Sequence, residues 1–383
     1  MNGAAATTER AAQAGQAGRA VLLVGAANSI HLQRWSNALA RAGLRLHVAT
    51  LHTALATGWL PEVTLHRLRP SGAVGYIGAV PALRRLLHAQ RFDLVHAHYA
   101  TGYGVLATLA NSRPRLVSVW GSDVDDFPDK SMLHAALLRR VLRSADALAA
   151  TSQALARRVH QLLPLRPPAQ QLHLTPFGVD TERFAPAVAS RPVGAQLVIG
   201  SSKGLADTYG IDVLLRAYAQ LPQVNRHGQA LQLRLLADGP QAAEYRQLAD
   251  VLGLQGRVHF GGGLPHAHMP AALNELDVFV APSRRESFGV SVLEASACAL
   301  PVVASAVGGL PEVVQHGVTG LLVPPGSVAA LAAALTTLAD DAALRRSMGR
   351  AGRQMVQAHY AWPSCVAQML AVYDQVLAAP VRP

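Results

Sequence analysis

Residues 277–304 read DVFVAPSRRESFGVSVLEASACALPVVA, and this stretch decides the fold class of the chain. A short apolar run at Val278–Val280 indicates a buried strand, and a helical pattern follows at Ser287–Cys298. The next apolar run, Val302–Ala304, indicates a second strand. A strand, a helix and a strand in this order predict a βαβ unit, whose two strands lie parallel in one sheet.

The same alternation continues on both sides of this unit. It opens with an apolar run at Ala20–Val24, a helical pattern that starts near Ile30 and a strand at Leu46–Thr50. A segment with three prolines, Thr175–Pro192, separates this first series from a second one that begins at Leu197–Gly200. Two such series predict an α/β protein with two Rossmann-like, doubly wound domains that face each other across a cleft.

The domain boundaries follow from these two series, and two domains of ordinary size fit a chain of 383 residues. Residues 1–20 are expected to form a flexible tail, and no signal peptide is predicted there. Residues 21–185 and 186–360 are expected to be the two domains. Residues 361–383 are expected to form a helix that crosses back to the first domain.

The composition excludes several classes of protein. Half of the residues are apolar and 15% are charged, which is too apolar for a disordered chain. No apolar run reaches 18 residues, so the sequence predicts no membrane-spanning helix. The two cysteines, Cys298 and Cys365, are too isolated for a predicted disulfide or a cysteine-based metal site, which favours a reducing cytoplasm.

The net charge of +11 is concentrated in the first half of the chain. Residues 1–185 hold 20 Lys and Arg against 10 Asp and Glu, which suggests an anionic partner. Nucleic acid is not expected, because the sequence has no basic run with interleaved aromatic residues and no zinc-ligand spacing. An anionic membrane surface on the cytoplasmic side is the favoured partner. The alternative is an arginine-rich surface that is merely solvated.

Two arginine clusters carry this membrane hypothesis. The segment 83–92 combines arginines with leucines and a phenylalanine in a pattern typical of an amphipathic interfacial helix. A second cluster lies at 139–143. The arginines concerned are Arg84, Arg85, Arg91, Arg139, Arg140 and Arg143, and the apolar residues are Leu83, Leu86, Leu87 and Phe92.

Glu286 lies where the strand at Val278–Val280 gives way to the predicted helix. Free N–H groups of Ser287, Phe288 and Gly289 at a helix start could hold a diphosphate or a sugar hydroxyl without a metal ion. Glu286 could then accept hydrogen bonds from sugar hydroxyls. Glu294 comes eight residues later, on roughly the same side of the helix, where a carboxylate suits the two hydroxyls of a ribose. The alternative is a helix with two unrelated acidic residues.

Lys203 is a second candidate, because it comes shortly after the strand at Leu197–Gly200 in the stretch Ser201-Ser202-Lys203-Gly204. A cation at a strand end could offset the charge of a departing diphosphate, as a metal ion does elsewhere. Lys130 and Lys203 are the only lysines among 34 Lys and Arg residues. A lysine in this place therefore suggests a specific function, and coincidence is the alternative.

These motifs together resemble those of the family-4 glycosyltransferases, which have the GT-B fold. The most specific likeness is Glu286-x7-Glu294 within PSRRESFGVSVLEA, followed by LPVVASAVGGLPEVVQHGVTGLLVPPG at residues 300–326. Shorter matches are WGSD at 120–123, FGVD at 177–180 and ADGP at 237–240. The resemblance covers nearly the whole chain from about residue 20.

The resemblance implies a nucleotide-sugar donor in the second domain, transfer with retention at the anomeric carbon, and neither a metal ion nor a cofactor. Glu286 and Lys203 would be catalytic, Glu294 would hold the ribose, and the backbone near Leu264 would contact the base. The implied donor-binding residues are Glu294, Ser287, Phe288, Gly289, Val290, Gly239, Leu264, Ser201, Thr208 and Gly25. The acceptor-binding residues expected in the first domain are His31, His98, Asp123 and Trp120.

Three positions depart from the family pattern. Thr208 stands where many members carry a second basic residue, and Arg284 or Arg285 is the expected substitute. Trp120 stands where many members carry a histidine, which leaves a polar acceptor contact to Asp123, His98 or His31. The loop that begins at Gly25 lacks the paired glycines common in the family. His96 is expected to be packed in the protein interior.

The sequence therefore predicts a retaining glycosyltransferase that moves a hexosyl unit from a UDP- or GDP-sugar to a hydroxyl of a glycan or lipid-linked acceptor. Synthesis of cell-surface polysaccharide or glycolipid is the expected setting, with a cytoplasmic protein peripheral to the inner face of the membrane. One alternative is a non-catalytic relative that binds a glycan or a partner enzyme. A nicotinamide-dependent dehydrogenase is disfavoured, because neither first turn reads G-x-G-x-x-G.

Overall fold

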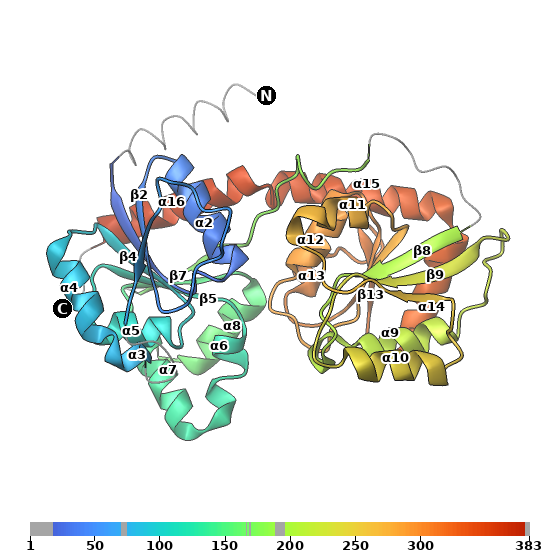
Figure 1. The fold of residues 1–383 in the computed structure, drawn as a ribbon, viewed down its shortest axis with the longest axis horizontal. Helices are drawn as coiled ribbons and strands as arrows, with labels where there is room; N and C mark the ends of the chain where they lie inside the picture. Colours follow the sequence, from blue (N-terminus) through green and yellow to red (C-terminus); the bar gives the residue numbers. More distant parts are fainter. Residues whose placement is uncertain (1–17, 70–74, 166, 168–169, 188–195, 380–383) are drawn as a thin grey trace. The chain divides into compact units, whose positions relative to one another are not determined.

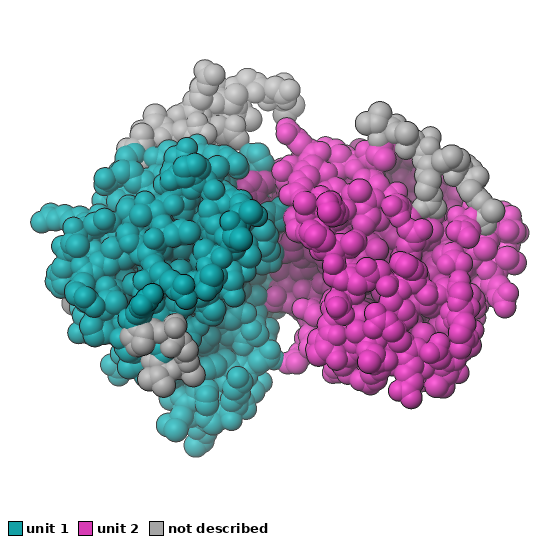
Figure 2. Space-filling view, in the orientation of Figure 1, with its two compact units in different colours: residues 1–177, 363–383 teal, residues 178–362 magenta. Residues whose placement is uncertain are grey.

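The computed structural model describes residues 18–69, 75–165, 167, 170–187 and 196–379. The chain forms two compact units, which Figure 2 shows in separate colours. The first unit comprises residues 1–177 and 363–383, and the second comprises residues 178–362. The chain thus leaves the first unit eight residues before the predicted boundary at 185.

A parallel sheet of seven strands forms the centre of the first unit (Figure 1). Its order is β3-β2-β1-β4-β5-β6-β7, so the strand order reverses between β1 and β4, where doubly wound folds bind ligands. The described part of the predicted tail is 18–20, and Ala20 already belongs to β1. The strands are β1 (Ala20–Val24), β2 (Arg45–Thr50), β3 (Thr64–Arg67), β4 (Leu94–His98), β5 (Arg115–Val119), β6 (Ala147–Ala150) and β7 (Gln171–Leu174).

Helices cover this sheet. In four of these helices buried leucines or valines occur together with arginines that are exposed or half-buried, which is the pattern of a helix with one face on a core. The helices are α2 (Ile30–Arg41), α3 (Gly75–Gly78), α4 (Val80–Ala89), α5 (Tyr103–Leu109), α6 (Ser122–Asp125), α7 (Met132–Ser144), α8 (Gln153–Leu162) and the 3-10 turn η1 (Pro128–Lys130).

The helix α4 corrects one of the two proposed membrane contacts. Leu83 is fully buried, and Leu86, Leu87 and Phe92 pack against the same hydrophobic core of the first unit. The exposed residues of this segment are the arginines, Arg84 among them, and His88, Ala89 and Gln90. The apolar face of the segment 83–92 is therefore already covered by protein. The segment is thus not an interfacial helix.

The last helix, α16 (Trp362–Ala378), contacts the first unit over most of its length. Tyr373 lies with its hydroxyl 2.8 Å from Nδ1 of His96 in β4, and Gln368 donates from Nε2 to the Leu174 carbonyl at 2.9 Å. Asp374 forms an ion pair with Arg19. The final helix thus packs against the first unit, although the chain reaches it only after completing the second.

The second unit holds a parallel sheet of six strands in the order β10-β9-β8-β11-β12-β13. Its inner strands are buried almost throughout, because helices cover both faces of a parallel sheet. The strands are β8 (Gln196–Ser201), β9 (Ala230–Leu235), β10 (Val258–Phe260), β11 (Val278–Ala281), β12 (Val302–Ser305) and β13 (Gly320–Val323). The helices are α9 (Ile211–Ala219), α10 (Ala242–Val251), α11 (Met269–Leu273), α12 (Val290–Ala297), α13 (Leu310–Val313), α14 (Val328–Asp340) and α15 (Ala342–His359), with 3-10 turns η2 (Asp207–Tyr209) and η3 (His266–His268).

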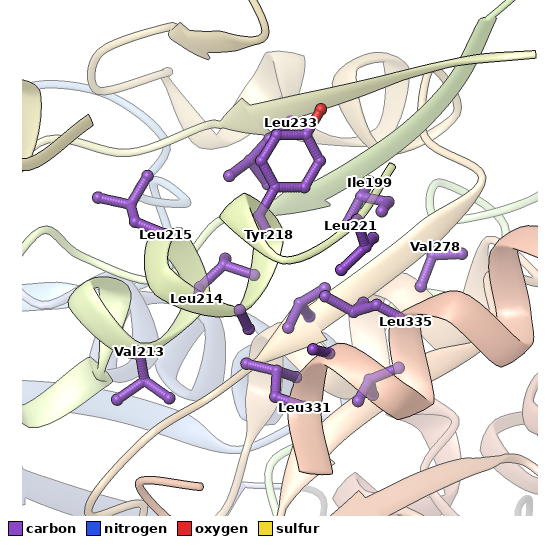
Figure 3. Packing of buried hydrophobic residues seen from close by; sticks show 14 of the residues in the cluster. Ile199, Val213, Leu214, Leu215, Tyr218, Leu221, Leu233, Val278, Leu331 and Leu335 are labelled. Atoms are coloured by element: carbon purple, nitrogen blue, oxygen red, sulfur yellow. The ribbon is translucent and has the colours of Figure 1, made fainter. Parts of the chain in front are cut away.

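The core of the second unit lies between its sheet and the helices α9 and α14. Figure 3 shows Leu214 and Tyr218 of α9 beside Leu335 of α14, close to Ile199 and Val278 of the sheet. All five are buried, and each large apolar side chain stabilises the fold by about 1.5–3 kcal/mol relative to an exposed position. This core fixes the strand ends from which the candidate site is built.

The predicted α/β class with two parallel-sheet domains is confirmed. The cleft between the two domains stays a prediction. None of the described helices combines the length and the apolar character needed to cross a membrane. Cys298 and Cys365 are both buried free thiols.

Candidate active site

The loop Pro282–Gly289, called here the Glu286 loop, connects β11 to α12 in the second unit. Sequence reasoning began the helix at about Ser287, which is wrong, because α12 begins at Val290. Gly289 precedes it with a φ of 110°, a left-handed conformation that strongly favours glycine. The N–H groups of Val290 and Ser291, rather than those of Ser287–Gly289, therefore form the first turn, where they lack intrahelical partners.

Two glycines, Gly308 and Gly309, pack against the backbone of the Glu286 loop. The N–H of Gly309 donates to the carbonyl of Glu286 at 3.0 Å. A side chain at Gly308 would bring its Cβ within 1.8 Å of that same carbonyl oxygen, and a Cβ at Gly309 would lie 2.6 Å from the Ser287 carbonyl oxygen. The sequence GG after β12 is thus required for the backbone of the loop to approach so closely.

Lys203 and Glu286 meet inside the second unit. Lys203 follows β8, and its ammonium group forms an ion pair with the Glu286 carboxylate. The hydroxyl of Ser283 donates to the same carboxylate oxygen at 3.3 Å. The two side chains of the pair are 7% and 13% exposed, so water screens their interaction only weakly. An anion that entered here would compete with Glu286 for the lysine.

Glu294 lies in the middle of α12 and is buried. Its Oε1 accepts a hydrogen bond of 2.8 Å from Nε2 of His266, in the turn η3 that follows Leu264 and Pro265. Because Glu286 is in a loop and only Glu294 is in the helix, the eight-residue spacing does not represent two helical turns. Sequence reasoning missed His266, since no spacing or periodicity connects it to Glu294.

Arg284, one of the two arginines expected to substitute for the basic residue missing at Thr208, is already paired within the protein. Arg284 makes two parallel hydrogen bonds to Asp212, of 2.8 and 2.7 Å, and these raise the pKa of Arg284. Its backbone N–H donates to the Thr208 carbonyl at 2.8 Å. The guanidinium is therefore committed within the protein, and the backbone of Thr208 anchors the Glu286 loop. Arg285 is exposed.

The other predicted donor-binding residues differ in whether their side chains could contact a ligand. Ser201 is buried at the end of β8 and accepts a hydrogen bond from the Lys203 N–H at 3.3 Å. Gly239 packs so closely on the loop after Lys203 that an added Cβ would lie 2.4 Å from the Leu205 carbonyl oxygen. The Phe288 ring is buried beside Tyr360, so its side chain belongs to the protein interior. Ser287, Val290 and Leu264 are half-buried.

Gly25 lies in the first unit, at the carboxyl end of β1. A Cβ added there would come within 3.4 Å of the Cβ of His98 and 2.9 Å of the Leu32 side chain. The residue therefore belongs to the surroundings of the predicted acceptor residues within this unit. Its predicted donor contact stays a prediction.

A cavity of about 660 Å³ opens in the first unit near the switch between β1 and β4. Three of the four predicted acceptor residues, His31, His98 and Trp120, line it. The imidazole of His98 lies 5.0 Å from the Trp120 ring centre, and His31 lies 4.5 Å from that of Phe177. Sequence reasoning missed most of the remaining wall, which includes Tyr76, Ile77, Tyr99, Tyr103, Val105, Phe127 and Leu137.

The two histidines of β4 have different environments. His96 is fully buried, with Nδ1 at 2.8 Å from the Tyr373 hydroxyl and Nε2 at 2.7 Å from that of Ser118, as expected for a packed residue. His98 is also buried, but neither of its ring nitrogens has a hydrogen-bond partner among the described residues. Loss of solvation on burial lowers the pKa of His98 to about 3, so the ring is neutral at pH 7.

Asp123 is the predicted acceptor residue that does not line this cavity. Its buried carboxylate accepts three backbone N–H groups, from Ala100 at 2.8 Å, Trp120 at 3.1 Å and Gly121 at 2.9 Å. Burial raises the pKa of Asp123, and these hydrogen bonds counteract that rise. We interpret Asp123 as a positioning residue that holds the loops on either side of the cavity.

The helix α7 carries the second arginine cluster on a surface groove of about 990 Å³. Arg139, Arg140 and Arg143 line this groove, and none of the described acidic side chains forms an ion pair with them. At the start of the same helix, Met132 and Leu133 are 84% and 82% exposed. The residues that combine exposed apolar surface with unpaired positive charge are therefore on α7 and not on α4.

Both units match known families. Residues 20–152 match the description "Glycosyl transferase 4-like", and residues 188–355 match "Glycosyl transferases group 1". A GDP-mannose-dependent alpha-(1-6)-phosphatidylinositol monomannoside mannosyltransferase of Mycobacterium tuberculosis is 32% identical over 306 residues, which cover 75% of this chain and 77% of that protein. The chain belongs to the family 4-like glycosyltransferases.

Two further similarities place this glycosyltransferase among its relatives. A D-inositol 3-phosphate glycosyltransferase of Kribbella flavida is 32% identical, over 74% of this chain and 71% of that protein. The structure of a sucrose-phosphate synthase from Thermosynechococcus elongatus superimposes with a TM-score of 0.80 and 26% identity, covering 94% of this chain and 100% of that one. The fold of this glycosyltransferase is thus GT-B. Within its described residues, no group of three or more His, Cys, Asp or Glu side chains is arranged to hold a metal ion.

Proposed function

We propose that this glycosyltransferase moves a hexosyl unit from a GDP- or UDP-sugar to an acceptor hydroxyl, with retention at the anomeric carbon. One observation carries the proposal: Lys203 and Glu286, from the ends of the neighbouring parallel strands β8 and β11, are in direct contact. A lysine and a carboxylate together suit a substrate that joins a diphosphate to a sugar, because each group has a partner of fitting charge.

The donor would lie along the Glu286 loop and the start of α12. In this arrangement Glu294 accepts hydrogen bonds from the ribose hydroxyls, and the backbone near Leu264 contacts the base. The first-turn N–H groups at Val290 bind the diphosphate together with Lys203, so their positive charge replaces that of a metal ion. The mycobacterial relative, which is named as GDP-mannose-dependent, supports a nucleotide-sugar donor.

The reaction would break the bond between the anomeric carbon and the diphosphate oxygen and form a bond from that carbon to the acceptor oxygen. The hydroxyl proton leaves with the nucleoside diphosphate or passes to solvent. Lys203 would stabilise the negative charge that develops on the departing diphosphate. Glu286 would hold the hydroxyls of the sugar in transfer, so that its anomeric carbon faces the acceptor.

The acceptor would bind in the cavity of the first unit, where His31, His98 and Trp120 lie. A glycan or a lipid-linked glycan is the proposed acceptor, in the synthesis of cell-surface polysaccharide or glycolipid. The relative that acts on phosphatidylinositol monomannoside, according to its name, supports this class. A cytoplasmic location is the remaining part of the proposal.

We further propose that α7 binds the anionic surface of the membrane. Met132 and Leu133 would enter the lipid headgroup region, and Arg139, Arg140 and Arg143 would contact anionic headgroups. Each basic residue close to such a surface contributes about 1 kcal/mol to binding. This replaces the segment 83–92, whose apolar side chains pack in the protein core.

Calorimetric titration with UDP-, GDP-, ADP- and dTDP-sugars tests the proposal. We expect the wild type to bind one nucleotide class and the Glu294→Gln variant to lose that binding, because an amide is a poorer acceptor for two hydroxyls. Glu244→Gln, at an exposed position on α10, is the matched control and should bind normally. NMR of the product then reports the anomeric configuration. No binding of any nucleotide sugar by folded protein would favour the non-catalytic alternative.

A further inference from the structure

The cavity of the first unit is walled mainly by rings and aliphatic side chains. Tyr76 and Tyr103 meet edge to face, with ring centres 5.2 Å apart. The hydroxyl of Tyr103 is occupied by the Leu51 N–H at 3.0 Å and by His52 Nδ1 at 2.6 Å, so this side chain contributes its ring to the wall. Val105 extends the apolar surface. A wholly polar acceptor would leave this surface in contact with water at a cost of about 25 cal/mol per Å².

His98 differs from the other polar residues of this wall, which are Ser29, His31, His52 and Thr101, because it alone of these is buried. It is buried, it lines the cavity, and both of its ring nitrogens lack a hydrogen-bond partner among the described residues. A neutral imidazole offers one N–H donor and one acceptor nitrogen. A hydroxyl group can satisfy either of them, since it both donates and accepts. The cavity therefore combines a buried site for a hydroxyl, at His98, with an extended apolar surface.

The apolar surface continues from the cavity to the outside of the unit. Leu137 of α7 lines the cavity and is 39% exposed, and Ile77 of α3 lines it and is exposed. Leu133 lies one helical turn before Leu137, on the same side of α7, and is itself largely exposed. A hydrocarbon chain could thus pass from the cavity along α7 without crossing a polar rim at these residues.

We propose that the acceptor is an amphiphile whose hydroxyl-bearing end meets His98 while its hydrocarbon chain lies against Val105 and Leu137. This inference rests on the proposed function, and it selects a lipid-type acceptor over a free glycan. It also gives a reason for the exposed Leu133 of α7, which lies one helical turn away from Leu137 in the cavity wall. The chain of the acceptor would leave the cavity on the side that we assign to the membrane surface.

Straight-chain alcohols from 1-butanol to 1-octanol test this inference, because they contain only the hydroxyl and the hydrocarbon chain. Binding is followed by the NMR signal of the Trp120 indole N–H, assigned with Trp120→Phe. We expect affinity to rise by about fourfold for each methylene that enters the cavity. Hexane-1,6-diol, which has a polar group at each end, should bind more weakly than 1-hexanol. Equal affinity for all alcohols would overturn the inference.

Two variants separate the hydroxyl site from the chain site. Leu137→Glu should reduce the gain in affinity per methylene, whereas Leu109→Glu, at a position that is 38% exposed and outside the cavity, should leave it unchanged. His98→Phe should weaken all alcohols by a similar factor and preserve the gain per methylene. An unchanged gain in Leu137→Glu would overturn the path along α7.

Nucleotide-sugar binding to the same preparations distinguishes this inference from the proposed function. Intact nucleotide-sugar binding without dependence on chain length would remove the amphiphile and leave the glycosyltransferase. The expected dependence on chain length without any nucleotide-sugar binding would keep an amphiphile site and remove the proposed reaction.

Discussion

Lys203 and Glu286 form a nearly buried ion pair, although 83 residues separate them in the chain. The contact exists because β8 and β11 are neighbours in the second sheet, so both residues follow carboxyl ends at the same edge. A buried pair of this kind is poor evidence for stability, because removing two charges from water is costly. A function in binding a charged substrate is the better explanation for its presence.

Replacement of that lysine tests this explanation. Lys203→Met should lower kcat for sugar transfer by about 100-fold or more, because a donor group that stabilises developing negative charge is lost. Lys130→Met, which removes the other lysine at an exposed position, is the matched control and should keep kcat. Steady-state kinetics with the nucleotide sugar identified by calorimetry gives the comparison. An unchanged kcat in Lys203→Met would contradict the assignment.

A single methyl group should disturb the Glu286 loop. Gly309→Ala places a Cβ about 2.6 Å from the Ser287 carbonyl oxygen, and backbone atoms on both sides leave it no room. We expect a folded protein that has lost most of its donor affinity, measured by calorimetry beside circular dichroism. Gly352→Ala, where the nearest atom would be an ordinary 3.4 Å away, should bind the donor normally. Full affinity in Gly309→Ala would show that the loop adapts.

His266 should influence donor binding through Glu294. His266→Ala removes the hydrogen bond to that carboxylate, and we expect nucleotide binding to weaken by about tenfold, the typical effect of one hydrogen bond to a charged group. His266→Gln retains a side-chain N–H donor and should restore part of the affinity. Calorimetric titration of both variants measures the effect. Equal affinity in His266→Ala and the wild type would assign the contact to packing alone.

The buried histidines predict how stability depends on pH. Burial lowers the pKa of His98 from 6.5 to about 3, so between these values the unfolded chain binds a proton that the folded protein does not. The free energy of unfolding should therefore fall as pH decreases from 6.5 towards 4, by up to about 1.4 kcal/mol per pH unit for this group. Urea unfolding at several pH values measures the slope. His98→Phe should reduce it, with His88→Phe, at an exposed position, as control.

The exposed apolar residues of α7 lead us to expect that the protein binds anionic membranes. The wild type should co-sediment with vesicles that contain anionic lipid at low salt, and the variant Met132→Glu with Leu133→Glu should bind at least tenfold more weakly. Each exposed apolar side chain that inserts contributes up to about 1.5–3 kcal/mol. Val251→Glu, at a position 77% exposed in the second unit, controls for the added charge. A wild type that fails to bind such vesicles would remove the membrane from the proposal.

The start of α12 is a feature that the sequence pattern predicted incorrectly. The segment Ser287–Cys298 was identified as a helix, but its first turn proved to be loop up to Gly289. Helical pattern cannot reveal that Gly309 binds the Glu286 carbonyl, since this contact joins residues on either side of a strand. The position of the free N–H groups at the start of the helix therefore shifted by about one turn, and the functions of Glu286 and Glu294 stay predictions.

The sequence by itself determined the alternation of strands and helices, because apolar periodicity and glycine positions are local properties of a chain. It also singled out Lys203 and Glu286 as candidates, since each follows a recognisable strand, and Glu294 as a candidate in the helix that comes after Glu286. Only the tertiary structure decided which side chains meet: His266 with Glu294, Arg284 with Asp212, and the aromatic wall around His98. Those contacts join residues with no regular spacing, and they arise from packing between elements that are distant in the chain.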